Sequence, residues 1–488
     1  MPFEFDSATR RALGYKLIDR IDDYYASLPE RAVQLPADER TFSALTDGIP
    51  ESGDDAAQVL DEVCRELIDK GFHVPAANYF GLMNPTPTYM AVLAEMLVSA
   101  LNPQLATLAR SQLASKIENE TVRWIGERVG WASSGTTNAF GGTFTSGGNE
   151  ANFTALALAL AHAFPDYVNE GVVAIGARPV FYSSGESHHS LDKSAGLLGI
   201  GRRAGRRIRV NSRVQLDPER LEEQIEEDVE AGLKPFCIVA TAGTTNSGAI
   251  DDIPALAGIA RSHGVWLHVD GAYGAAAIFS DQHRELLRGI ELADSVTIDP
   301  HKWLAMPFAA GVILTSHPEM LEQAFAVPTP YMPKVADTAS IDNFQISTQW
   351  SRRMNSLKFY LTLRVHGRGA YEELIDGQMA LAEQVAQGIS ASQHFELASP
   401  QTLPIFNLRL KTEDRIGESE LARLHGEIVN EITRDGKRWI SLTTVDGRSV
   451  IRFMIISYLT AERHCQELLT ALEAAAEQSF PRSTAARG

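Results

Sequence analysis

Short apolar segments alternate with amphipathic ones from Thr143 onward, and this alternation limits the possible folds more than any other feature of the sequence. The expected strands cover residues 180–182, 236–241, 265–269, 295–298 and 312–315, and the expected helices between them cover residues 151–163, 218–231 and 254–262. Strands that alternate with helices are typical of a mostly parallel sheet. We therefore predict an α/β fold in which ligands bind beyond the carboxyl ends of the strands.

The segments on either side of this alternation have a different pattern. Residues 8–27 and 56–68 are amphipathic helical stretches separated by proline-punctuated polar sequence, which is too little chain for a separate core. Beyond Tyr371, helical and strand patterns follow one another as in a small α+β unit. We predict an N-terminal helical arm that makes dimer contacts (residues 1–88), a large domain (residues 89–370) and a small C-terminal domain (residues 371–488).

The composition excludes several classes of protein. The 488 residues carry a formal net charge of −18, which leaves no basic surplus to neutralise the phosphates of a nucleic acid. The three cysteines, Cys64, Cys237 and Cys465, lie far apart and show neither disulfide nor zinc-site spacing. No apolar run reaches the length of a membrane span, and the N-terminus lacks a signal-peptide pattern. We therefore expect a cytoplasmic protein that binds a small molecule and no metal.

The segment Asp294-Ser-Val-Thr-Ile-Asp-Pro-His-Lys-Trp303 contains the lysine of greatest interest. Pro300 ends the preceding β-branched strand, because proline cannot donate to a sheet ladder. Lys302 therefore lies on a loop just beyond the carboxyl end of a strand. The aromatic and apolar residues that follow it would desolvate its ammonium and favour a neutral amine that can form a Schiff base. A surface lysine beside a core tryptophan is the alternative interpretation.

The segment Thr143-Phe-Thr-Ser-Gly-Gly-Asn-Glu-Ala151 is a strand–turn–helix pattern with the chemistry of an anion site. Gly147 and Gly148 would let the backbone approach an anion closely, and the start of the following helix would supply free N–H groups. Asn149 adds a side-chain donor. No Gly-Lys-Ser/Thr sequence follows, so the segment is not a Walker P-loop. A plain glycine-rich turn is the alternative.

An acidic residue, Asp270, ends the apolar segment Trp266-Leu-His-Val-Asp270. A buried carboxylate at that point needs a cationic partner, and the protonated ring nitrogen of a pyridine cofactor would be one. A helix-capping or turn aspartate is the alternative.

Two other motifs have weaker functional interpretations. Ser187-His-His-Ser190 contains adjacent histidines on a loop, where a shared metal ion is unusual, so His188 is interpreted as a ring-stacking imidazole, with a solvated histidine as the alternative. Gly199-Ile-Gly-Arg-Arg-Ala204 matches the letters of the dinucleotide-binding fingerprint. A helical pattern precedes it where that fingerprint requires a strand, which makes a nicotinamide oxidoreductase the less favoured hypothesis.

Four of these motifs, in this order and spacing, resemble those of the group II pyridoxal-phosphate-dependent amino-acid decarboxylases, which include the aromatic L-amino acid, histidine, glutamate and 2,4-diaminobutyrate decarboxylases. The motifs are Gly-Gly-Asn-Glu-Ala, Ser-His-His-Ser, His-Val-Asp-Gly-Ala-Tyr and Asp-Pro-His-Lys-Trp, and Ser351-Arg-Arg-Met-Asn-Ser-Leu-Lys358 and Val450-Ile-Arg-Phe453 agree with them. The resemblance covers nearly the whole chain. It implies a fold-type I enzyme with a mostly parallel seven-stranded sheet, bound pyridoxal 5′-phosphate, and a homodimer with active sites at the subunit interface.

The resemblance also implies roles for individual residues. The catalytic residues would be Lys302, which forms the Schiff base, Asp270, which pairs with the pyridinium nitrogen, His188, which stacks on the ring, and Tyr331, which protonates Cα of the quinonoid. The cofactor would also be held by Gly147, Gly148, Asn149 and His301 at its phosphate and by Thr245 near its ring. The substrate would contact Tyr79, Phe80, Gln104 and Arg452, with Arg452 meeting its carboxylate.

Departures from the family pattern leave the substrate open. Gln104 and Ala106 stand where the partner subunit of aromatic decarboxylases contributes bulky apolar residues, and Arg110 stands where alanine is common. This more polar lining disfavours an indole or a phenol, and Arg110 would either reach an acidic side chain or form a surface salt bridge. The predicted reaction is decarboxylation of an L-amino acid to its amine. Aldehyde synthesis, transamination, another lyase reaction on the same fold and a noncatalytic binding role are the alternatives.

Overall fold

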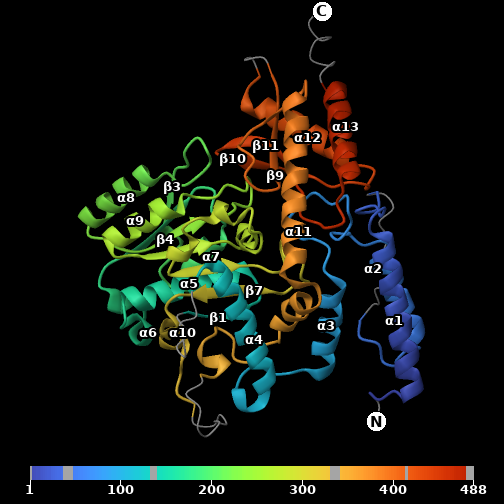
Figure 1. The fold of residues 1–488 in the computed structure, drawn as a ribbon, viewed down its shortest axis with the longest axis horizontal. Coiled ribbons are helices and arrows are strands. Elements are labelled where there is room, and N and C mark those ends of the chain that lie inside the picture. The colour runs from blue at the N-terminus through green and yellow to red at the C-terminus, as the bar shows by residue number, and fades with distance from the viewer. Residues whose placement is uncertain (1–2, 37–47, 132–139, 330–340, 413–415, 480–488) are drawn as a thin grey trace, which may run out of the picture.

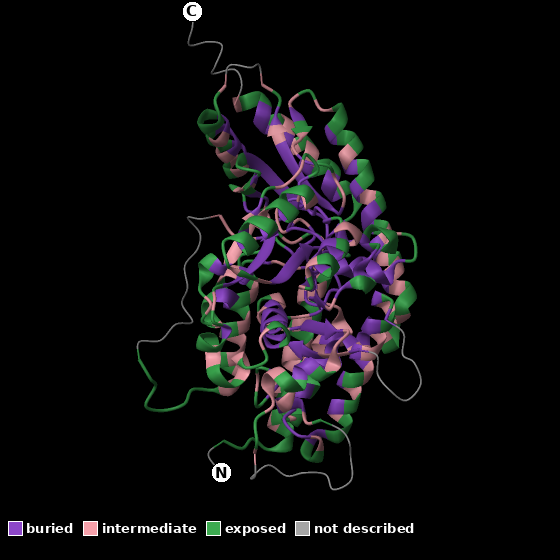
Figure 2. Cartoon of the chain, turned by 90° about the vertical axis from the view of Figure 1, so that its left-hand side faces the viewer, coloured by how far each residue is buried: buried purple, intermediate pink, exposed green. Residues whose placement is uncertain are grey.

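The computed structural model of the chain describes residues 3–36, 48–131, 140–329, 341–412 and 416–479. Figure 1 shows a body built around a large sheet, a smaller sheet with its own helices above it, and helices α1 and α2 standing beside the body. Buried residues gather in the two sheets, whereas the outer faces of the helices are exposed (Figure 2).

The large sheet confirms the predicted α/β fold with seven mostly parallel strands. Its strand order is β1-β7-β6-β5-β4-β2-β3, and the five strands from β6 to β3 are parallel, whereas β7 is antiparallel to both of its neighbours. The strands are β1 (Gly141–Thr145), β2 (Pro179–Ser184), β3 (Gly205–Ile208), β4 (Lys234–Thr241), β5 (Trp266–Asp270), β6 (Ser295–Ile298) and β7 (Gly311–Thr315). The sequence analysis missed β3, because its arginines give no apolar alternation.

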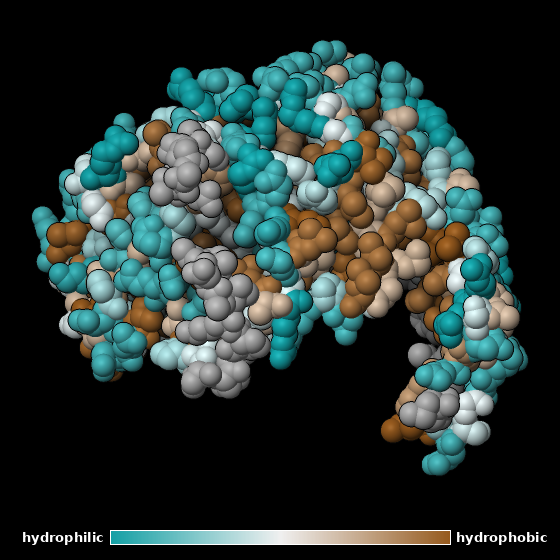
Figure 3. Space-filling model, turned by 60° about the horizontal axis from the view of Figure 1, so that its bottom comes forward, coloured by the Kyte–Doolittle hydropathy of each residue, from teal (hydrophilic) through white to brown (hydrophobic). Residues whose placement is uncertain are grey.

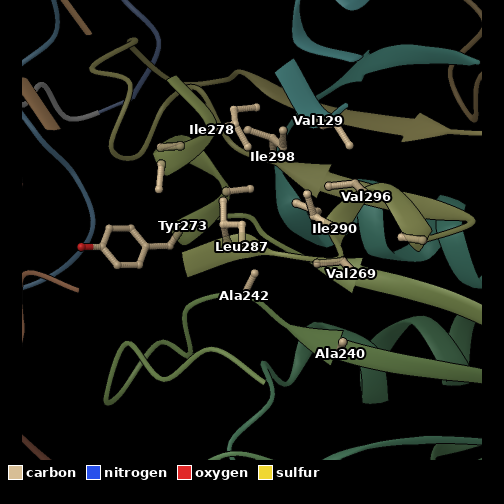
Figure 4. Close-up of a cluster of buried hydrophobic side chains, with 14 of the residues drawn as sticks. Val129, Ala240, Ala242, Val269, Tyr273, Ile278, Leu287, Ile290, Val296 and Ile298 are labelled. Atoms are coloured by element: carbon tan, nitrogen blue, oxygen red, sulfur yellow. The ribbon is translucent and has the colours of Figure 1, made fainter. Parts of the chain in front are cut away.

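The strands of this sheet are buried on both faces. In β4, Ile238 and Ala240 pack in a core with α4, α8 and α9, whereas Cys237 and Val239 pack on the other face with α5, α7 and α10. The helices are α4 (Leu108–Val129), α8 (Pro218–Glu230) and α9 (Ile253–His263) on the first face, and α5 (Gly148–Ala163), α7 (Ser190–Leu197) and α10 (Pro318–Phe325) on the second. Figure 4 shows part of the first core. Burial on both faces explains why these strands read as continuous apolar segments.

The second sheet forms the core of the C-terminal part with two helices. Its order is β10-β11-β9-β8, and each neighbouring pair is antiparallel. Its strands are β8 (Phe395–Leu397), β9 (Ile405–Leu410), β10 (Ser441–Val445) and β11 (Arg448–Met454), covered by α12 (Glu418–Thr433) and α13 (Glu462–Ser479). The sequence analysis expected such an α+β unit; the domain boundaries themselves stay a prediction.

One long helix, α11 (Ser356–Ala391), connects the two sheets (Figure 1). Near its start, Phe359 and Tyr371 are buried in the core of the large sheet, whereas Val385 and Ile389, near its end, are buried in the core of the small one. The helix is interrupted at Gly367, whose φ of 75° is outside the helical range. The remaining connections include α3 (Tyr89–Leu101), α6 (Tyr167–Glu170) and 3₁₀ turns at Gly171–Ile175, Arg202–Ala204, Gly274–Phe279, Arg284–Leu287, Ile290–Leu292 and Asn343–Gln345.

The N-terminal arm consists of α1 (Ser7–Ser27) and α2 (Ala56–Asp69), each capped by an aspartate that precedes it. No residue of α1 is buried, and Glu66 is the only residue of α2 that is. The apolar side of α2, with Val59, Val63 and Leu67, is exposed. In Figure 3 the arm stands apart from the body, and hydrophobic side chains gather on the side of the body that faces it.

Candidate active site

A cavity of about 300 Å³ lies beyond the carboxyl ends of β4, β5 and β6. Eight of the residues proposed from the sequence line it: Gly147, Gly148, Asn149, His188, Thr245, Asp270, His301 and Lys302. The lining also includes residues that the sequence analysis did not assign to the site: Met83, Ser146, Asn152, Thr241, Gly243, Ala272, Tyr273, Asp299 and Phe308. The fold therefore brings together residues that are up to 225 positions apart, from Met83 to Phe308.

The turn between β1 and α5 forms a cradle that leaves room for an anion. Gly147 has a φ of 154°, and a Cβ there would lie 2.9 Å from Cε1 of His301. A Cβ on Gly148 would lie 2.8 Å from Oδ2 of Asp299. Both positions therefore require glycine. Because α5 starts at Gly148, the unpaired N–H groups and the positive dipole end of the helix face this opening.

Asp270 ends β5 and is 5% exposed. Its Oδ2 accepts a hydrogen bond from Nδ2 of Asn152 at 2.8 Å, and its Oδ1 accepts one from the Ala272 N–H at 3.2 Å. Oδ1 of Asn152 in turn accepts from Oγ1 of Thr297 at 2.9 Å, which fixes the amide orientation. Among the described residues, no lysine, arginine or histidine nitrogen lies within 4.0 Å of the Asp270 carboxylate. A buried carboxylate without a cationic side chain beside it is suited to bind a cationic ligand.

His188 lines the cavity with a neutral ring. Its Nδ1 accepts a hydrogen bond from the Ser190 N–H at 3.2 Å, so the ring proton is on Nε2. Desolvation lowers the pKa of His188, and this outweighs the opposing effect of Asp270. A flat, uncharged ring suits stacking on an aromatic ligand. The adjacent His189 points to solvent, with a side chain 91% exposed.

Lys302 faces a carboxylate that the sequence analysis did not assign to the site. Its Nζ lies 3.1 Å from Oδ2 of Asp299, and 23% of its side chain is exposed. The expected apolar neighbours lie elsewhere: the Trp303 side chain is fully buried, and its ring stacks on Tyr273 at 5.2 Å. Of the aromatic and apolar residues that follow Lys302, Phe308 lines the same cavity, whereas Trp303 does not, because the chain turns and carries it into the core.

His301 is held by the strand that follows the Lys302 loop. Its Nδ1 accepts a hydrogen bond from the Ala310 N–H at 2.9 Å, and its Nε2 lies 3.5 Å from Oδ2 of Asp299. Burial lowers the pKa of His301, so the ring is a neutral Nε2–H donor. The Phe308 ring lies 4.5 Å from the His301 ring and is 63% exposed. An exposed aromatic ring at a cavity can contact an apolar ligand, and the sequence carried no signal for it beyond its position after Lys302.

Arg452 lies outside the lining and supports Thr245, which belongs to it. Arg452 Nη1 donates to the Thr245 carbonyl at 3.2 Å and to Oδ1 of Asn246 at 3.0 Å, and its Nε donates to Oγ of Ser441 at 3.1 Å. The guanidinium is 6% exposed, and burial lowers its pKa. The small sheet thus holds a loop of the large one.

The remaining proposed substrate contacts do not line this cavity within one chain. Tyr79 stacks on Trp439 with ring centroids 5.5 Å apart, and Phe80 is fully buried. Gln104 is exposed; its Nε2 donates to Oγ of Ser351 at 2.7 Å, and its Oε1 accepts from Nη1 of Arg110 at 3.4 Å. The remaining catalytic candidate, Tyr331, lies outside the described residues.

Comparisons with known proteins settle the family. The sequence pattern described as the pyridoxal-dependent decarboxylase conserved domain matches residues 36–411. The chain is 31% identical to an aromatic-L-amino-acid decarboxylase of Bacillus atrophaeus, over 96% of this chain and 97% of that one. It belongs to the pyridoxal-dependent decarboxylase family.

Other relatives and solved structures agree with this membership. A phenylacetaldehyde synthase of Arabidopsis thaliana is 28% identical, over 95% of this chain and 94% of the other. The structure of mouse CSAD superposes with a TM-score of 0.89 at 26% identity, covering 97% of this chain and 99% of that one. The fold is also that of Oryza sativa TDC with PLP and tryptamine, with a TM-score of 0.90 at 24% identity, covering 97% and 99% of the two chains.

The resemblance stated from the motifs is therefore confirmed, as are the fold type, the cofactor and the reaction class. The chain is a pyridoxal-phosphate-dependent lyase that decarboxylates an amino acid. Two observations show that the cavity fits the cofactor: glycines at the cradle leave room for a phosphate, and Asp270 lacks a cationic partner that a protonated pyridine would supply.

In the part of the chain that the structure describes, no group of three or more His, Cys, Asp or Glu side chains is arranged to hold a metal ion. No helix of the described segments has both the length and the apolar character needed to cross a bilayer.

Proposed function

We propose that this pyridoxal-phosphate enzyme decarboxylates an aromatic L-amino acid to its amine in the cavity at the ends of β4, β5 and β6. The observation that carries the proposal is the convergence on that cavity of Lys302, a buried aspartate, a neutral histidine and a glycine cradle. The aromatic substrate class is supported by the exposed Phe308 ring beside His301 and by the named activity of the Bacillus atrophaeus relative. It replaces the expectation drawn from Gln104, Ala106 and Arg110, because none of the three lines the cavity of its own chain.

Each lining residue has a separate proposed role. Lys302 holds the cofactor covalently, and Gly147, Gly148, Asn149 and His301 donate hydrogen bonds to its phosphate. Asp270, oriented by Asn152, would keep the ring nitrogen protonated, His188 would stack on the ring, and Thr245 would contact it. Pyridoxal phosphate supplies an electron sink for cleavage of the bond between Cα and the carboxylate.

The proton-transfer step is proposed for a residue outside the described segments. After carbon dioxide leaves, a phenol close to Cα would donate the proton that completes the amine, and Tyr331 is the proposed donor. A phenylalanine at that position would leave the carbanion open to oxygen, which connects this residue to aldehyde synthesis as the second candidate reaction. The named activity of the Arabidopsis thaliana relative is the observation that favours this alternative.

The substrate contacts remain proposals that depend on a second subunit. Gln104 and Arg110 are both exposed and bonded to each other, which suits a polar patch that a partner subunit would present to the cavity. Arg452 is proposed to attract the substrate carboxylate through its charge while it supports Thr245. Tyr79 and Phe80 are proposed to hold in place the chain segment that carries Met83, which lines the cavity.

A homodimer is proposed as the active form. It is supported by the exposed apolar side of α2, with Val59, Val63 and Leu67, and by exposed Met96, Leu97 and Leu101 on α3. Burial of such patches drives association in water. A cytoplasmic location is proposed because Cys64, Cys237 and Cys465 are free thiols, as expected in a reducing compartment.

The test of the proposed function is a screen of the twenty amino acids for release of carbon dioxide and for the product formed, in air and under nitrogen. We expect an aromatic amino acid to be turned over fastest and the amine to be the main product in both atmospheres. Borohydride reduction followed by peptide mapping should find the cofactor on Lys302, and Lys302→Ala should lose both the fixed cofactor and turnover. Fixation at another lysine would contradict the proposed site, and an oxygen-dependent aldehyde would support the second reaction.

A further inference from the structure

Asp299 is the charged residue of the cavity to which the proposed reaction gives no role. Its side chain is 2% exposed. One of its oxygens, Oδ2, lies 3.1 Å from Nζ of Lys302 and 3.5 Å from Nε2 of His301. Its other oxygen, Oδ1, has no hydrogen-bond partner among the described residues. A single carboxylate therefore faces both the amine proposed to bind the cofactor and the imidazole proposed to bind its phosphate.

The same oxygen also lies against the anion cradle. A Cβ built on Gly148 would be only 2.8 Å from Oδ2 of Asp299, so the carboxylate fills the space beside the first residue of α5. The amino end of a helix attracts negative charge. Asp299 is thus directed at every positive feature that the cradle offers: the Lys302 ammonium, the His301 N–H and the start of α5.

The charged side chains that line the cavity provide little net attraction for the doubly negative phosphate of the cofactor. Its acidic residues are Asp270 and Asp299, and Lys302 is the only lysine or arginine among the described residues that line it. His188 and His301 are neutral, because burial lowers the pKa of both. The phosphate must therefore be held by neutral N–H donors and the helix end, close to a carboxylate that repels it.

We propose that Asp299 is an internal competitor of the cofactor phosphate, which keeps the cofactor exchangeable. In the empty site its carboxylate occupies the positive groups of the cradle and keeps Lys302 and His301 in position. In the loaded site the same charge repels the phosphate and speeds cofactor release. This inference rests on the proposed location of the phosphate at Gly147, Gly148 and Asn149.

The experiment compares wild type with Asp299→Asn, which keeps the shape of the side chain and removes its charge. Apoenzyme is titrated with pyridoxal phosphate and, separately, with pyridoxal, which lacks the phosphate, and bound cofactor is followed by its visible absorbance. Release is measured after dilution of the holoenzyme. We expect Asp299→Asn to bind pyridoxal phosphate at least about tenfold more tightly and to release it correspondingly more slowly, since removal of a nearby like charge is worth about that factor. The affinity for pyridoxal should change less than about threefold.

Two further variants serve as controls for effects that do not arise from the charge of Asp299. Asp299→Ser removes the charge together with the carboxyl shape, and it should tighten pyridoxal phosphate binding in the same direction. Asp294, which pairs with His317, precedes the first residue of β6, whereas Asp299 follows the last. Asp294→Asn therefore makes the same change of charge far from the cradle. It should leave the affinities for pyridoxal phosphate and for pyridoxal unchanged. Unfolding midpoints of all variants identify any that do not fold.

The outcomes separate the inference from the proposed function. Inorganic phosphate should compete with pyridoxal phosphate for the wild-type apoenzyme; if it does not, the proposed phosphate site is wrong and the inference falls with it. If phosphate competes but Asp299→Asn and Asp299→Ser bind the cofactor no more tightly than wild type, the competitor role alone is overturned. An equal gain for pyridoxal also overturns it, because the effect would then not act on the phosphate.

Discussion

Helices α9 and α2 have the same amphipathic design but differ in what covers their apolar sides. In α9, the apolar residues Ile253, Leu256 and Ala260 are buried against the large sheet. In α2, Val63 and Leu67 are 39% and 67% exposed. The pattern of a helix thus shows which side will be covered, but not whether the cover comes from its own chain or from a second one.

The large sheet and the N-terminal arm also differ in whether they carry residues of the proposed active site. The residues proposed to bind the cofactor all lie at one edge of the large sheet, where strand ends and the start of α5 fix their backbone. Helices α1 and α2 contribute none of the described residues that line this cavity. If this comparison is right, changes in the large sheet affect turnover and folding directly, whereas changes in the arm act through association.

The largest effect is expected at Asp270. Asp270→Asn keeps the acceptor for Asn152 but cannot keep a ring nitrogen protonated, so kcat should fall by about 10³-fold, roughly 4 kcal/mol of transition-state stabilisation. Steady-state kinetics give the fall, and the visible absorbance should show that the cofactor is still bound. A variant with wild-type kcat would remove Asp270 from the mechanism.

The next largest effect is expected in α9, the helix whose apolar side is buried against the large sheet. Leu256→Ala removes a fully buried side chain from α9 and should lower the free energy of unfolding by about 2–5 kcal/mol, because the cavity cannot close. Denaturant unfolding of holoenzyme measures it. At protein concentrations where a dimer stays intact, the loss of unfolding free energy should not depend on concentration, because the contacts that Leu256 makes lie within one chain.

A pH effect tests the polar network beneath the site. Burial lowers the pKa of His268 to about 4, from an ordinary value of 6.5, while its Nδ1 bonds to Oγ of Ser295. The unfolded chain therefore takes up a proton that the folded chain does not, and stability present above pH 6.5 is lost as the pH falls from 6.5 towards 4. The difference in pKa is worth roughly 3 kcal/mol. Unfolding midpoints at several pH values should fall less steeply in His268→Asn than in wild type; parallel curves would exclude His268 as a source of acid sensitivity.

The smallest effect on the isolated chain is expected in the arm. Leu67→Ala makes the same substitution as Leu256→Ala, but at a side chain that is 67% exposed, so the free energy of unfolding of the monomer should change by less than about 0.5 kcal/mol. If α2 is covered by a second subunit, the variant should instead dissociate at a higher concentration, as measured by analytical ultracentrifugation. An unchanged dissociation constant would indicate that Leu67 is not part of the contact.

The sequence predicted most of the fold because the strands of the large sheet are continuous apolar segments. It missed β3, an arginine-rich edge strand that is defined by backbone pairing with β2 and not by apolar side chains. The helical patterns on either side of Gly367 are separate in the structure too, where the φ of 75° at Gly367 interrupts α11.

The site was predictable where residue type and strand position agree, as at Asp270 and Lys302. Asn152 and Asp299 were not identified, although Asp299 belongs to the segment of Lys302 and Asn152 directly follows the glycine-rich segment. Their roles depend on contacts with distant residues, such as Nδ2 of Asn152 with Asp270 and Asp299 with Gly148, and spacing along the chain carries no information about such contacts.

The part of α11 beyond Gly367 has a consequence for cooperativity. Its first half, with Tyr371 and Ile375, is built into the core of the large sheet, and its second half, with Val385 and Ile389, is built into that of the small sheet. Neither core can therefore melt without exposing apolar side chains of the other. We therefore expect a single heat-absorption peak in calorimetry. A fragment cut between residues 370 and 371 would carry a severed helix and two incomplete cores, so the two sheets should behave as one folding unit in spite of their separate topologies.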